Sequence, residues 1–74
     1  MTRYFNPEYL GKKIRELRTS KALTQEELAE IIGVTRNTIR NYERGRTFPR
    51  EFAFNALYEF FDVDPEVFLE RGEF

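Results

Sequence analysis

The stretch from Thr24 to Gly45 constrains the fold more than any other part of the chain. It opens with the letters TQEE, a capping box in which a Thr hydroxyl and a Glu carboxylate each bind the other's backbone amide. Gly33 follows, and glycine ends helices readily because it adopts the left-handed conformation at little steric cost. Thr35 is the next N-cap candidate. The sequence therefore predicts two short helices joined by a tight turn.

Three positions predict how these two helices cross. Ala29 lies four residues before Gly33, and Ile39 lies six residues after it. A small side chain at Ala29 lets the helices approach closely, and Ile39 can then pack the second helix onto the first. The apolar face expected for the first helix consists of Leu28, Ile31 and Ile32.

The second helix, expected from Thr35 to about Arg44, carries a polar stripe without an acid. At about 100° of rotation per residue, the Arg and Asn side chains cover about 140° of its circumference. Ile39 and Tyr42 fall on the opposite side. An ordinary solvated helix mixes acids and bases, whereas Arg and Asn alone are suited to bidentate contacts with guanine and adenine edges. The stripe therefore favours DNA binding.

Length and composition exclude several other classes of protein. The 74 residues suit one domain, which we place over residues 1–74. Because the chain has no Cys and no His, we expect no metal and no cofactor. The chain also has no Gly-rich phosphate loop, so we do not expect an enzyme. The chain shows no long apolar run and no secretory signal, so we expect no membrane span and a cytoplasmic location.

Charge is distributed unevenly along the chain. Residues 1–50 hold eleven Lys or Arg against six Glu, whereas residues 51–74 hold one Arg against seven Asp or Glu. A local basic face can attract phosphate while an acidic region keeps the net charge near zero, here −1. Ordinary surface charge explains the asymmetry equally well.

Helix signals also appear outside the central stretch. Asn6-Pro7 predicts a helix over about residues 7–19, because Asn is a good N-cap and Pro suits the first helical turn. A fourth helix is expected over about residues 50–61, and Asp64-Pro65 predicts a short fifth one. No strand pattern is found. These signals predict an all-α fold.

The segment from Ile14 to Leu69 resembles the Xre/Cro family, which includes the lambdoid phage repressors and Cro. The matching segments are IRELR, LTQEELAE, IGVTRNTIRNYERG, Pro49 and FFDVDPEVF. The resemblance implies a compact five-helix, repressor-like bundle with a helix-turn-helix at residues 24–45.

The resemblance also implies roles for individual residues. It assigns base contacts to Arg36, Asn37, Arg40 and Asn41, of which Arg40 could instead reach a phosphate. It assigns backbone contacts to Gln25, Thr35, Arg44 and Arg46. It implies a partly buried ion pair between Arg18 and Glu43. The chain departs from the family pattern after Pro49, where Arg50 replaces the usual Ser or Thr cap.

The last third of the chain is rich in phenylalanine. We expect Phe54, Phe61 and Phe68 in the core, whereas Phe52, Phe60 and Phe74 exceed what one helix face can bury. An exposed aromatic surface usually marks an interface. We therefore predict a homodimer, or another protein partner, through residues 50–74. The alternative is that Tyr4, Phe5 and Tyr9 cover some of these rings.

The expected function is that of a sequence-specific DNA-binding transcriptional regulator. We expect a repressor that binds a palindromic site in double-stranded DNA as a dimer, with its third helix in the major groove. An antitoxin or a mobile-element repressor fits equally well. The alternative from another class is a protein-interaction module that kept the fold and lost DNA binding.

Overall fold

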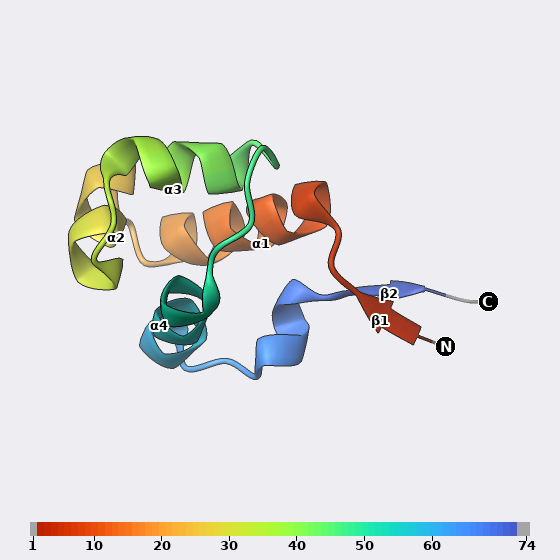
Figure 1. Ribbon diagram of the computed structural model, residues 1–74. Coiled ribbons are helices and arrows are strands. Elements are labelled where there is room, and N and C mark those ends of the chain that lie inside the picture. The colour runs from red at the N-terminus through yellow and green to blue at the C-terminus, as the bar shows by residue number, and fades with distance from the viewer. Residues whose placement is uncertain (1, 73–74) are drawn as a thin grey trace.

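The computed structural model describes residues 2–72 and consists mainly of helices (Figure 1). Its elements, in chain order, are β1 (Thr2–Tyr4), α1 (Pro7–Ser20), α2 (Gln25–Ile32), α3 (Arg36–Glu43), α4 (Glu51–Phe61), the 3₁₀ turn η1 (Pro65–Phe68) and β2 (Glu70–Gly72). The structure therefore has four α-helices, and the prediction of a fifth was wrong. Asp64 caps a four-residue 3₁₀ turn in its place, accepting a hydrogen bond from the amide of Glu66 at 2.9 Å.

The all-α fold class is confirmed, with the addition of two three-residue strands that showed no pattern in the sequence. Strands β1 and β2 pair antiparallel, with Tyr4 opposite Glu70. The Tyr4 hydroxyl donates to Glu70 Oε1 at 3.0 Å, and Asn6 Nδ2 donates to the same oxygen at 2.7 Å. Three-residue strands are too short to show alternation in the sequence, and these two lie at opposite ends of the chain.

The helix starts follow the sequence in three of four cases. Asn6 Oδ1 accepts from two amides at the start of α1, the capping box at Thr24 is complete, and Thr35 caps α3. The Thr24 amide donates to the Glu27 carboxylate and lowers the pKa of that carboxyl. In contrast, Arg50, which stands where the family usually has Ser or Thr, precedes α4 without any side-chain cap bond.

One core connects all the helices. Its fully buried side chains include Leu10, Ile14, Leu28, Ile39, Leu57 and Phe68. Ile31 was expected on the apolar face of α2 but is 46% exposed. The buried face of α2 is formed by Leu28, Ala29 and Ile32, and Ile31 lies about 100° away from its centre.

Helices α1 and α3 approach most closely at Gly11, a residue that the sequence analysis did not single out. Gly11 is buried, and a Cβ atom there would overlap the carbonyl oxygens of Tyr42 and Glu43. The missing side chain therefore lets the C-terminal end of α3 rest on the backbone of α1.

Candidate nucleic-acid interface

Helix α3 has one side in the core and the other on the surface (Figure 1). Ile39 is completely buried and Tyr42 is only 5% exposed, so these two residues anchor α3 as the helical spacing predicted. Arg36, Asn37 and Arg40 are exposed. Together with Thr35, these three residues line a hollow of about 350 Å³ over the first half of α3.

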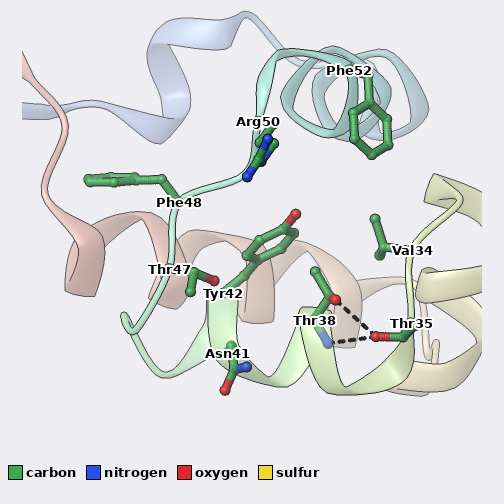
Figure 2. A pocket seen from close by; sticks show the side chains of 9 residues that line it. All are labelled: Val34, Thr35, Thr38, Asn41, Tyr42, Thr47, Phe48, Arg50 and Phe52. Atoms are coloured by element: carbon green, nitrogen blue, oxygen red, sulfur yellow. Dashed lines mark hydrogen bonds between the residues drawn. The ribbon is translucent and has the colours of Figure 1, made fainter.

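The start of α3 is fixed by two hydroxyl groups. Thr35 Oγ1 accepts from the Thr38 amide at 3.1 Å and shares a hydrogen bond with Thr38 Oγ1 at 2.9 Å (Figure 2). Because these bonds hold the first turn, Arg36 and Asn37 leave the helix in defined directions. The DNA contact assigned to Thr35 itself stays a prediction.

Asn41 lies one helical turn after Asn37, on the same side of α3. It is half-buried and lines a separate, apolar cleft on the side of α3 that faces the start of α4 (Figure 2). Arg36, Asn37 and Arg40 therefore line one hollow, and Asn41 lines the adjoining cleft, with Thr35 common to both.

A partly buried ion pair joins α1 to the end of α3. Arg18 Nε and Nη2 donate to the two carboxylate oxygens of Glu43 at 2.6 and 3.0 Å, and Arg18 Nη1 donates to the Leu23 carbonyl at 2.8 Å. The side chains of Arg18 and Glu43 are 13% and 5% exposed. The bonds to Glu43 raise the pKa of the Arg18 guanidinium, although burial acts in the opposite direction. This is the pair that the family resemblance implied.

Gln25 and Arg44 lie beside this pair, and Arg46 follows in the loop after α3. Gln25 Nε2 donates to Glu43 Oε1 at 3.2 Å, so the first residue of α2 is tied to the end of α3. Arg44 and Arg46 are exposed on either side of Gly45, whose φ of 72° turns the chain out of the helix. Their contacts with DNA stay predictions.

The apolar cleft between α3 and α4 has a volume of about 390 Å³ (Figure 2). Phe48 and Phe52, which are 44% and 58% exposed, are among the residues that line it, together with Val34 and Tyr42. Burial raises the pKa of the Tyr42 phenol, and the positive charge of Arg50 offsets part of the rise. The exposure of Phe52 was predicted from its excess over one helix face, whereas that of Phe48 was not, because a single Phe beside Pro49 carries no such signal.

The N-terminal segment packs against two phenylalanine rings, but neither is one of the three that the alternative prediction named. The Phe5 ring makes edge-to-face contacts with Phe48 and Phe54, with centroids 5.5 and 5.6 Å apart. Phe60 is partly buried against Phe61, at 5.0 Å between centroids, so it does not stand free as expected. Phe74 lies outside the described residues.

Two negative findings apply to residues 2–72. Within that range the structure contains no group of three His, Cys, Asp or Glu side chains that could hold a metal ion. No helix in the same range is both long and apolar enough to cross a membrane.

The helix-turn-helix domain family matches residues 11–71, which is most of the chain. The chain belongs to this family. Among curated proteins it is 37% identical over 63 residues to the HTH-type transcriptional activator BcrR of Enterococcus faecalis, covering 85% of this chain and 31% of BcrR. It is 43% identical over 53 residues to the cryptic phage CTXphi transcriptional repressor RstR of Vibrio cholerae, covering 72% of this chain and 48% of RstR. The chain thus spans less than half the length of each of these two relatives.

A solved structure agrees with these relatives. The P22 c2 repressor, crystallised in complex with a synthetic operator, superposes with a TM-score of 0.78 and 28% sequence identity. The match covers 82% of this chain and 92% of the repressor chain. These comparisons confirm the Xre/Cro resemblance.

Proposed function

We propose that the protein is a sequence-specific DNA-binding transcriptional regulator that reads the major groove with the outer side of α3. The observation that carries the proposal is the charge of that helix. Arg36 and Arg40 are exposed, whereas Glu43, the only acid in α3, is neutralised by Arg18 and removed from the surface. The outer side therefore offers donors and positive charge to DNA and no exposed carboxylate that would repel phosphate.

Each predicted contact has a role in this proposal. Arg36, Asn37 and Asn41 read base edges, and Arg40 reaches a base or a phosphate. Gln25, Thr35, Arg44 and Arg46 bind the DNA backbone, which fixes the register of α3 in the groove. The single domain spans residues 1–74.

The sign of regulation is proposed to be repression. Repression needs only a DNA-binding surface, because a domain that occupies an operator excludes other proteins from that DNA. The surface around α3 would be sufficient. The 43% identity to a phage repressor supports repression, although another relative is named an activator.

We also propose a cytoplasmic location, because DNA lies in the cytoplasm of bacteria such as the sources of these relatives.

A homodimer through the apolar cleft completes the proposal. Phe52 lines the cleft and is 58% exposed, so a two-fold axis could place the Phe52 of each copy in the cleft of the other. The cleft adjoins α3, so a two-fold axis that runs along the outward direction of α3 would leave both copies of α3 on one side of the dimer. A palindromic operator with half-sites about one helical turn apart requires that arrangement.

Selection from a random DNA library, sequenced after retention at low and at high salt, tests the proposed function. We expect enrichment of a palindromic motif that survives high salt. Arg36→Ala with Asn37→Ala should abolish the motif, whereas Lys13→Ala, on α1 and paired with Glu16, should leave it unchanged. Motif-free binding that vanishes with salt would contradict sequence recognition.

A protein-interaction module is the second candidate, because exposed Phe48 and Phe52 favour a protein partner. If the wild-type chain retains no DNA at all, the protein-interaction module becomes the first candidate.

Sedimentation tests the dimer separately. We expect a dimer that Phe52→Glu converts to a monomer, and a wild-type chain that stays monomeric at high concentration removes the dimer.

A further inference from the structure

A second basic hollow lies on the α1 side of α3, and it joins three residues already assigned to DNA, Gln25, Arg40 and Arg44, to one that is not, Arg15. It has a volume of about 270 Å³, and α1, α2 and the end of α3 all contribute to it. Its lining residues are Arg15, Arg18, Gln25, Arg40, Glu43 and Arg44. Arg15 comes from the middle of α1 and has no role in the contacts described above.

The charges in this hollow do not balance. Glu43 is the only acid among the lining residues, and Arg18 already binds both of its carboxylate oxygens. Arg15, Arg40 and Arg44 are exposed, and none of them forms an ion pair with an acid in the part of the chain that the structure describes. Three guanidinium groups from two helices therefore surround one hollow without a counterion from the protein.

The chemistry of this arrangement fits a phosphate group. A guanidinium group is always charged and presents a planar set of donors that matches phosphate oxygens two at a time. Arg40 and Arg44 are four residues apart and lie on the same side of α3, which places them beside each other. Arg15 faces the same hollow from α1, so the three side chains can approach one phosphate, or two adjacent ones, from different directions.

We propose that Arg15 binds the DNA backbone and that the hollow it shares with Arg40 and Arg44 is a phosphate site. This inference rests on the proposed function, and it extends the interface from α3 onto α1. A contact of this kind carries no sequence information, so Arg15 contributes to the affinity for every duplex to a similar degree.

The test is the salt dependence of binding by Arg15→Ala, measured on the selected operator and on an unrelated duplex of equal length. Losing one phosphate contact should make the slope of log K against log salt less steep by about 0.9. Between about 50 and 200 mM salt, the wild-type advantage should therefore shrink by about 3.5-fold on both duplexes. Arg15→Lys should keep most of the slope, because it keeps the charge.

Lys21→Ala is the matched control, because it also removes one positive charge near α1. The Lys21 ammonium group lies over the Phe60 ring, away from the hollow. Lys21→Ala should leave the slope unchanged. A slope for Arg15→Ala equal to that of Lys21→Ala overturns the phosphate site, even where the operator is still recognised. If the wild type selects no motif but Arg15→Ala still has the less steep salt slope, sequence recognition alone is overturned. If the wild type binds no DNA, both proposals are overturned. Equal unfolding temperatures of the variants exclude misfolding as the cause.

Discussion

Helices α3 and α4 pack on the same core but differ at their starts and on their exposed sides. A Thr35 hydroxyl bond fixes the start of α3, whereas Arg50 gives α4 no side-chain cap. The exposed side of α3 is polar, whereas α4 exposes 58% of Phe52 beside an apolar cleft. The difference suggests separate tasks: α3 is held rigidly for polar contacts of fixed geometry, and the start of α4 is left open to an apolar surface.

The largest expected effect comes from breaking the support of α3. Arg18→Ala leaves the carboxylate of Glu43 unpaired at a site that is only 5% exposed. We expect the free energy of unfolding in urea to fall by about 3–5 kcal/mol. Adding Glu43→Ala should recover part of that loss, whereas Lys13→Ala, which removes an exposed pair, should cost about 1 kcal/mol or less. A loss for Arg18→Ala as small as that of Lys13→Ala would mean that the pair does not hold α3.

Gly11→Ala tests the same support from the α1 side. At an ordinary helix position this substitution stabilises by about 1 kcal/mol. Here the new methyl group overlaps the α3 backbone, and we expect a loss of about 1–3 kcal/mol. Thermal unfolding gives the sign directly. Lys12→Ala at the next, exposed position serves as the control, and a stabilised Gly11→Ala variant would show that α3 does not rest on α1.

A side-chain N-cap for α4, like the one Thr35 gives α3, tests the same comparison at α4. Arg50 has an extended backbone, with φ of −72° and ψ of 169°, which suits an N-cap. Arg50→Ser should therefore stabilise the fold by about 1 kcal/mol in urea unfolding. Arg50→Ala removes the same charge without supplying a cap and should bring no such gain. Equal stability of the two variants would contradict an uncapped start.

The smallest effect concerns the capping box of α2 and its response to pH. The pKa of Glu27 is lowered by the Thr24 amide from its ordinary value of 4.5. The carboxylate therefore stabilises the fold above that value, and the contribution disappears as pH falls through the lower, folded-state pKa. Glu27→Gln keeps an acceptor at the position but removes the charge. Its unfolding temperature should lie slightly below wild type near neutral pH and converge with it in acid, and parallel curves would contradict this assignment.

Features that depend on neighbouring residues could be predicted from the sequence. The caps at Asn6, Thr24 and Thr35 obey local rules, and the anchor at Ile39 follows from helical spacing. The same reasoning separated the exposed Phe52 from the buried Phe61. These predictions needed no knowledge of which helix packs on which.

Features that depend on distant contacts could not be predicted. The role of Gly11 exists only because α3 crosses there, and Phe5 finds Phe54 through the folded chain. The pairing of β1 with β2 joins segments from the two ends of the chain, and neither segment alone is long enough to show a period. For the same reason Arg15 entered the candidate interface only once α1 and α3 were placed side by side.

The pairing of β1 with β2 has a practical consequence for attaching this domain to other proteins. The two strands run antiparallel at one end of the molecule, with α2 at the other end (Figure 1). The start of β1 therefore lies beside the end of β2, and linkers attached at these two points would emerge from the domain next to each other. This spacing suits insertion of the whole domain into a surface loop of a host protein, with α3 still free to meet its target.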